Sequence, residues 1–597
     1  MALVASDSAS LWIPFLRRLE QLGGVGAVLL ALLEFGMPVP QIPEERIHLG
    51  LVLYAGLFLL RLSLELYAGS AWRSRLLDLG LALVVLGALA VAATRSGDYF
   101  ASGWLRWLYV LLAAWLLHGL GLLQERLSRG NLRPALFLLG SLAVLALLGA
   151  LLLMLPGARA QGTRAWTFEE AFFTAASAVS VTGLSVRDVG TDLSFRGQVL
   201  LLALIQIGGL GLVALIGSAC ILERGKLRIR ELRFLGDAIG ADSPGRARRF
   251  LAFMLAFTIV CEALGAWALM RATEGVDLGP HARWWWCVFH SVSAFCNAGF
   301  GLSNASLIPF AAHGGILWCL ALLVIAGGLG FGTHRDLLAL RPLSLDRLRW
   351  VRWKLAQKLW WPWRKPSLDV AVQHRLSLHT RLVLVTSALL LGIGMLVFRF
   401  SEAPHSLKGA IDADPWLMSF FHSAMARTAG FNALDLSVIA PGTLFVLIVL
   451  MAIGASPVST GGGLKTTTVA VAALAVRSMA RNREQVEALG RSIPRQVVNA
   501  AMAITLIYGL LAVLTVAALL WTQPGLELDR AAFEGISALA TVGWSVGVTA
   551  EVSSSGHWIL AAAMLIGRIG PMAVLLSFAA RRQSLEYRYP EAPIQIG

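Results

Sequence analysis

Long apolar stretches separated by short polar segments run through most of the 597-residue chain. A helix needs about 20 apolar residues to cross a bilayer, and stretches such as 136–155 and 199–221 reach that length. Core helices of soluble proteins are rarely apolar on every side. The pattern predicts an all-α polytopic membrane protein.

From about residue 132 the pattern repeats four times, as a long apolar span, a short amphipathic segment and a second apolar span. Each middle segment holds a variant of one small-residue motif, and the glycines of the four copies are Gly183, Gly299, Gly430 and Gly543. Their positions differ by 116, 131 and 113 residues, which indicates four units of similar size. The helical part of each middle segment is too short to cross, so we expect a re-entrant loop.

The spacing of the apolar stretches sets the expected boundaries. In the four units, span, loop and span are expected at 132–156, 168–190 and 196–221; 249–272, 284–303 and 312–332; 379–399, 415–435 and 441–476; and 496–521, 530–550 and 556–580. About four further spans are expected at 22–38, 47–66, 77–94 and 104–123. The expected domains are an N-terminal extension (1–131), repeats 1 to 4 (132–240, 241–345, 379–485 and 486–580), a basic cytoplasmic linker (346–378) and a cytoplasmic tail (581–597).

Composition and charge support this interpretation and give it an orientation. Hydrophobic residues make up 57% of the chain and charged residues only 14%. The net charge of +15 does not form one patch suited to nucleic acid, because the basic residues gather in loops at 222–248, 333–378 and 477–495 and in the tail. These loops all fall on one side, which the positive-inside rule makes the cytoplasm. No cleavable signal peptide is expected, and the five cysteines lack the spacing of metal ligands.

The repeated motif predicts a cation filter. A backbone that leaves helical geometry at membrane depth exposes carbonyl groups, which is tolerated where they line a water-filled path. A short helix before each glycine points its partly negative C-terminus inward, and the glycine lets the chain return as an extended strand. Carbonyl oxygens of four such strands would replace the hydration shell of a potassium ion. Each unit supplies one quarter: 181–185, 297–301, 428–432 and 541–545.

The predicted filter residues are therefore four from each repeat. They are Val181, Thr182, Gly183, Leu184; Asn297, Ala298, Gly299, Phe300; Thr428, Ala429, Gly430, Phe431; and Thr541, Val542, Gly543, Trp544. The ion would be bound by backbone carbonyls alone. The alternative is that the small residues mediate close helix packing. Four copies in equivalent places favour the filter over this alternative.

The second span of the third unit is broken by glycines and a proline at 454–463. Such residues unwind a helix at membrane depth, and a loop beneath the filter would block the ion path until it moved. The predicted gate residues are Gly454, Ser456, Pro457, Ser459, Thr460, Gly461, Gly462, Gly463, Lys465 and Arg568. A static kink is the alternative. The segment 463–466 lacks the Gly-Lys pair and the preceding strand of a phosphate-binding loop.

Arg568 is a lone charge inside an apolar span. An arginine at membrane depth is costly and therefore a functional hypothesis. The alternative is an arginine that snorkels to the cytoplasmic face.

Across residues 132–580 the chain resembles the Trk/Ktr/HKT superfamily of potassium transporters. The most specific marks are 181–184, 293–300, 426–432 and 541–543. The resemblance implies four helix, pore-loop, helix modules around one pseudo-fourfold pore, with the broken span as the gate and Arg568 facing the pore beneath the filter. It favours potassium over sodium, because some sodium-selective relatives carry serine where this chain has Gly183. It also implies a homodimer regulated by a separate cytosolic nucleotide-binding subunit, since no Gly-x-Gly-x-x-Gly module is present here.

Three residues depart from the usual pattern of that family: Trp544 after the last filter glycine, Val458 in the broken span and Cys296 before the second filter strand. The N-terminal extension also exceeds the usual core.

We expect a potassium uptake protein of the cell membrane, a channel-like pore without a cofactor and without enzymatic activity. Coupled symport with sodium or protons is an alternative, for which Glu262 is the acidic candidate within a span. A polytopic membrane enzyme is a second alternative, for which His118, His290 and His422 are the intramembrane candidates.

Overall fold

The computed structural model describes residues 44–67, 82, 134–211, 244–303, 305–339, 376–409 and 413–570. Within this part of the chain the fold is helical apart from one small hairpin, so the predicted all-α architecture is confirmed. The spans expected at 22–38, 77–94 and 104–123, most of the loops 222–248 and 333–378, and the tail from 581 lie outside it. The span expected at 47–66 is helix α2 (Glu44–Tyr67).

The four predicted units are present as helix, short helix and helix. Repeat 1 has α5 (Pro134–Leu153), η3 (Pro156–Ala158), α6 (Phe168–Ser180), α7 (Val189–Asp192) and α8 (Phe195–Leu210), and repeat 2 has α11 (Pro244–Ala272), α12 (Arg283–Phe295), η4 (Ile308–Phe310), α13 (Gly314–Gly328) and α14 (Phe331–Ala339). Repeat 3 has α16 (Leu378–Ser401), α17 (Ser406–Gly409), α18 (Pro415–Met425), η5 (Leu436–Val438), α19 (Pro441–Ala452) and α20 (Thr466–Ala480). Repeat 4 begins with strands β1 (Val486–Ala488) and β2 (Arg491–Ile493), which pair antiparallel, and continues with α21 (Arg495–Thr522), α22 (Leu528–Leu539), α23 (Val548–Glu551) and α24 (Ser554–Ile569).

Three described helices are long and apolar enough to cross a membrane: Arg249–Ala272, Leu378–Ser401 and Arg495–Thr522. The pair α13 and α14 would add a fourth, but it is bent by 95°. The first helices of repeats 2, 3 and 4 therefore cross in one piece, and they turn large apolar side chains outward, for example Leu264, Ile393 and Leu510. Such side chains suit a surface that faces lipid.

The short middle helices α6, α12, α18 and α22 contain 11 to 13 residues. At about 1.5 Å per residue they reach only partway through a bilayer core of about 30 Å. Local sequence fixes where they begin: Thr167 and Glu170 form a reciprocal capping box on α6, and Asp414 caps α18 before Pro415. We call these four the pore helices.

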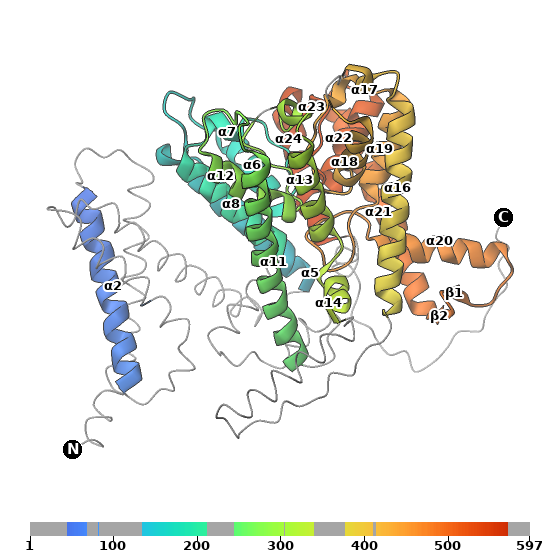
Figure 1. Ribbon diagram of the computed structural model, residues 1–597, viewed down its shortest axis with the longest axis horizontal. Coiled ribbons are helices and arrows are strands. Elements are labelled where there is room, and N and C mark those ends of the chain that lie inside the picture. Colours follow the sequence, from blue (N-terminus) through green and yellow to red (C-terminus); the bar gives the residue numbers. More distant parts are fainter. Residues whose placement is uncertain are drawn as a thin grey trace.

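Contacts between neighbouring repeats close a ring. Helix α8 of repeat 1 packs on α12 of repeat 2, α13 of repeat 2 on α18 of repeat 3, α19 of repeat 3 on α22 of repeat 4, and α24 of repeat 4 on α6 of repeat 1. Figure 1 shows the four repeats side by side, with the pore helices among the longer ones. The middle segments of all four repeats therefore converge on one axis.

One expected span is wrong in detail. The stretch 312–332 was predicted as a single helix, but α13 ends at Gly328 and the chain turns by 95° before α14. Gly330 has a φ of +85°, and a Cβ there would lie 2.5 Å from the carbonyl oxygen of Pro457. The bend arises because the broken segment of repeat 3 lies directly against this glycine.

Candidate functional site

Each pore helix is followed, one to three residues after its end, by a residue with left-handed backbone geometry. These residues are Val181, Asn297, Thr428 and Thr541, with φ between 53° and 69°. Asparagine tolerates this conformation, but β-branched residues rarely adopt it. Strain of this kind persists only where the surroundings enforce it, and it concentrates at functional sites. Four equivalent positions share it here, so it is a property of the repeat.

Two residues later each strand reaches its motif glycine, and the four glycines touch one another's strands in cyclic order. A Cβ on Gly183 would lie 2.3 Å from the carbonyl oxygen of Ala298, and one on Gly299 would lie 2.8 Å from that of Ala429. No side chain fits at such distances. The backbones of repeats 1, 2 and 3 therefore meet in succession.

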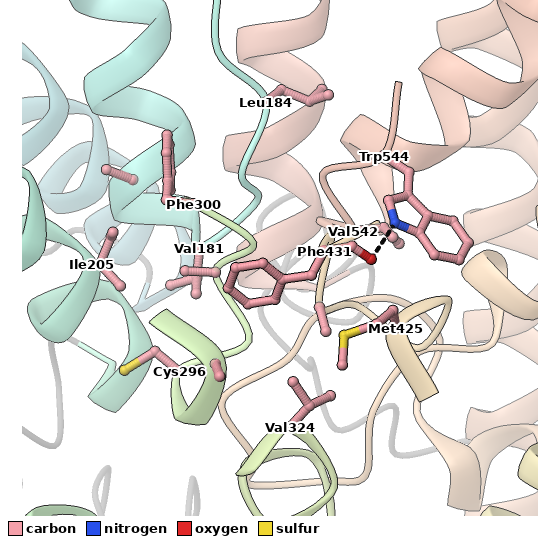
Figure 2. Close-up of a cluster of buried hydrophobic side chains, with 14 of the residues drawn as sticks. Val181, Leu184, Ile205, Cys296, Phe300, Val324, Met425, Phe431, Val542 and Trp544 are labelled. Atoms are coloured by element: carbon pink, nitrogen blue, oxygen red, sulfur yellow. Dashed lines mark hydrogen bonds between the residues drawn. The ribbon is translucent and has the colours of Figure 1, made fainter. Parts of the chain in front are cut away.

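The same contacts continue through repeat 4 and back to repeat 1. A Cβ on Gly430 would lie 2.5 Å from the carbonyl oxygen of Val542, and one on Gly543 would lie 2.0 Å from that of Thr182. The ring of four strands is closed. The structure thus brings the four motif glycines and the residues before them into one ring. Figure 2 shows six of the predicted filter residues within a cluster of buried hydrophobic side chains: Val181, Leu184, Phe300, Phe431, Val542 and Trp544.

The carbonyl groups in this ring are free of protein donors. In the described part of the chain, no hydrogen bond reaches the oxygens of Thr182, Ala298, Ala429 or Val542. Buried backbone carbonyls are almost always paired, so four unpaired ones around one axis require a partner that is not protein.

The strands are held to their own pore helices from behind. The amide of Thr182 donates to the carbonyl of Ser177 at 2.8 Å, and the amide of Gly183 donates to the Ser177 hydroxyl at 3.0 Å. Ala298 and Val542 repeat the first bond with Ser293 and Ser537, each at 2.8 Å. These bonds use the amide groups and leave the carbonyls to face the axis.

The broken segment of repeat 3 lies immediately beneath the ring. Helix α19 ends at Ala452 and α20 starts at Thr466, and the hydroxyl of Thr460 lies 3.1 Å from both the carbonyl of Phe295 and the side-chain amide of Asn297. A Cβ on Gly461 would lie 2.1 Å from the hydroxyl of Thr428. The segment therefore touches the ends of the filter strands.

Two cations fix this segment. The guanidinium of Arg568 donates to the carbonyl of Thr460 and, on the other side, to those of Gly208 and Gly209. The ammonium of Lys465 donates to the carbonyls of Gly461 at 2.7 Å and Gly462 at 3.4 Å. Arg568 thereby joins repeat 4 to repeats 1 and 3 beneath the ring.

The sequence reasoning missed a second glycine series. A Cβ on each of these glycines would collide with the last turn of the pore helix of the same repeat. The distance would be 2.2 Å from Gly208 to the Val179 carbonyl oxygen, 1.9 Å from Gly327 to that of Phe295, and 1.8 Å from Gly567 to that of Leu539. Each of these glycines seats its span against the C-terminus of its own pore helix. Three residues later the span ends at Gly211, Gly330 or Gly570, with φ between 78° and 88°. The recurring Gly-x-x-Gly was visible once the repeats were aligned.

The groups nominated for other functions have structural partners. The imidazole of His290 stacks on Trp286 and that of His422 on Phe398, and each ring contacts a backbone carbonyl. Glu262 lies on α11, with a carboxylate oxygen 3.8 Å from the sulfur of Cys296. His118 lies outside the described residues.

Comparisons with known proteins agree with this geometry. The family model for TrkH, cation transport protein, matches residues 150–587. The chain is 36% identical to the Ktr system potassium uptake protein B of Vibrio alginolyticus, over 78% of this chain and 95% of that protein. It is 32% identical to the protein of the same name from Bacillus subtilis, over 76% and 94%, and 30% identical to the potassium/sodium uptake protein NtpJ of Enterococcus hirae, over 80% and 100%. The crystal structure of the potassium transporter TrkH from Vibrio parahaemolyticus has the same fold, with a TM-score of 0.54 at 19% identity, over 85% of this chain and 99% of that one.

Proposed function

This chain belongs to the TrkH family of cation transport proteins, and we propose that it is the membrane subunit through which a cell takes up potassium. The observation that carries the proposal is the closed ring of donor-free carbonyls at Thr182, Ala298, Ala429 and Val542. Carbonyl oxygens in such a ring replace the water of a monovalent cation. The protein is a multi-pass protein of the cell membrane.

The ring acts as the filter and the segment 453–465 as the gate. Potassium enters from the side on which the pore helices begin, sheds water at the ring and moves down its electrochemical gradient when the segment withdraws. Arg568 adds a positive charge beneath the ring, which opposes a cation there as long as its bonds to Thr460 and Gly208 hold. No covalent step and no cofactor in this chain is needed for this transport.

Growth rescue tests the function. A bacterial strain that lacks its own potassium uptake systems should grow at low potassium when it expresses this chain, with and without a cytosolic partner. Rubidium uptake by the same cells should be competed by potassium far more than by sodium. Cells that express the protein in the membrane yet neither grow nor take up rubidium under either condition would refute the proposal.

We further propose a homodimer that works with a separate cytosolic nucleotide-binding subunit. Two relatives are named as proteins of a Ktr system, which is consistent with more than one component. The basic segments at 222–248 and 477–495 offer the cytoplasmic docking surface. Measuring the mass of the purified protein in detergent, alone and after co-expression with a candidate partner, tests both statements.

Coupled transport is the second candidate function, and Glu262 is the observation in its favour. An acidic group on a span, packed against Cys296 at the base of a filter strand, could take up and release a proton during transport. If Glu262→Gln leaves potassium uptake unchanged between pH 6 and pH 8, coupling through this group is ruled out.

A further inference from the structure

Trp544 is one of the three departures from the family pattern, and it is fully buried behind the filter, with 1% of its surface exposed. Its indole nitrogen donates to the carbonyl oxygen of Phe431 at 2.9 Å, a bond between the strands of repeats 3 and 4 (Figure 2). Both residues directly follow a motif glycine. The bond therefore engages a carbonyl two residues along the strand from the ring carbonyl of Ala429, beyond the carbonyl of Gly430; we call this position the outer level.

A second carbonyl at the same level is also engaged. The hydroxyl of Ser293 donates to the carbonyl oxygen of Phe300 at 2.7 Å, within repeat 2. In the described part of the chain, no donor reaches the carbonyls of Leu184 and Trp544, which complete this level. Two of the four oxygens above the ring are thus held by side chains, whereas all four in the ring are free.

We propose that Trp544 and Ser293 act as positioning residues that limit the outer level of the filter to two freely available carbonyls. This inference rests on the proposed potassium transport. An ion at the outer level is coordinated by fewer protein oxygens and keeps part of its water, and it is fully dehydrated only further in, at the carbonyls of the motif glycines and of the ring. Ion affinity and selectivity then depend chiefly on the ring.

Packing holds the indole in its place. Its ring lies 6.1 Å from that of His422, which is stacked on Phe398 with centroids 4.9 Å apart. A phenylalanine at position 544 would keep an aromatic ring at this place and remove the N–H group together with part of the indole. Leucine removes the donor and the aromatic ring, and Ser293→Ala removes a donor at the same level without changing position 544.

Loss of the donor leaves the Phe431 carbonyl buried without a partner, which is unfavourable. If the carbonyl turns toward the ion path, a cation there supplies the missing partner. Trp544→Phe should lower the KM for rubidium uptake by roughly twofold to tenfold, because one added hydrogen-bond-like contact has about that value. Ser293→Ala should act in the same direction through Phe300.

Rubidium uptake and its competition by sodium are measured in cells that express the wild type, Trp544→Phe, Trp544→Leu or Ser293→Ala. Trp521→Phe is the control, because Trp521 is 88% exposed on α21. The inference predicts a lower KM and weaker sodium competition for both Trp544→Phe and Ser293→Ala.

If the KM for rubidium uptake of both Trp544→Phe and Ser293→Ala equals or exceeds that of the wild type, the inference is overturned. It is also overturned if only Trp544→Leu changes rubidium uptake while the other two variants keep the wild-type KM. If Trp544→Phe does not reach the membrane, Ser293→Ala decides. Failure of the wild type to transport rubidium would instead refute the proposed function.

Discussion

The outer and inner halves of the pore are built on different plans. In the outer half every repeat supplies the same parts: a pore helix, a left-handed residue and a glycine in contact with the next strand. In the inner half, among the described residues, repeat 3 inserts the segment 453–465 with its own cation, Lys465, and repeat 4 contributes Arg568. Fourfold repetition is kept where an ion must be surrounded, and it is broken where one path must be closed.

Arg568 shows how a single position creates this difference. It follows Gly567, and the corresponding residues after Gly208 and Gly327 are both glycines. Those two positions carry no side chain, whereas the arginine side chain reaches repeats 1 and 3. The gate therefore depends on an exception within an otherwise repeated motif.

The largest effect is expected at the ring. Gly183→Ser places a side chain 2.3 Å from the Ala298 carbonyl, so the ring must distort, and we expect the preference for potassium over sodium to fall by at least about tenfold, or about 1.4 kcal/mol. Gly525→Ser is the matched control, because Gly525 has a similar φ of 98° but no atom within 4 Å of a Cβ. Reversal potentials in mixed ions measure the preference. An unchanged value for Gly183→Ser would remove this ring from the filter.

The next effect tests the inner half. Arg568→Ala removes the bonds to Thr460 and Gly208, and we expect ion flux without a regulatory partner to rise roughly fivefold. Arg568→Lys should give an intermediate flux, because a single ammonium does not match the two-sided guanidinium contact. The exposed Arg271→Ala serves as the control. Flux through proteoliposomes is the measurement, and a flux at or below the wild-type value in Arg568→Ala contradicts the gate.

A smaller effect is expected where the gate touches the filter. Thr460→Val removes the hydroxyl next to Phe295 and Asn297, which should raise basal flux by roughly twofold. Thr443→Val is its control, since the buried Thr443 hydroxyl has no partner among the described residues. Equal flux in the two variants would show that this contact does not hold the gate.

The smallest effect concerns the outer junction of repeats 4 and 1. The carboxylate of Glu169 accepts from the Ser554 hydroxyl and contacts a ring nitrogen of His557, each at 2.6 Å. Glu169→Gln should lower stability by about 1 kcal/mol and leave ion preference intact. The thermal midpoint of the detergent-solubilised protein measures this, with the exposed Glu274→Gln as the control. A lower potassium preference without a change in midpoint would give Glu169 a role in the filter instead.

The repeated outer half could largely be predicted from the sequence. Each repeat needs the same backbone geometry there, and the sequence therefore carries similar residues in all four copies. The four units, the re-entrant loops and the break at 454–463 all follow from apolar length and from glycine. The bend after Gly328 could not be predicted, because it depends on contact with Pro457 from another repeat.

The contacts between repeats could not be predicted from the sequence either. Trp544 and Phe431 are 113 positions apart, and Thr460 and Asn297 are 163 apart. A sequence can nominate such residues but gives no distance between them. Trp544 was noticed only as an unusual residue, and its bond to a filter carbonyl became visible when the strands were placed side by side.

The central claim is that the four repeats form one ion site at the ring. Crystals or frozen grids of the full chain prepared in rubidium or thallium test it most directly, because these ions substitute for potassium and scatter strongly. We expect density on the axis, encircled by the carbonyls of Thr182, Ala298, Ala429 and Val542. Density only at other positions, or an empty ring in a protein that transports rubidium, would contradict it.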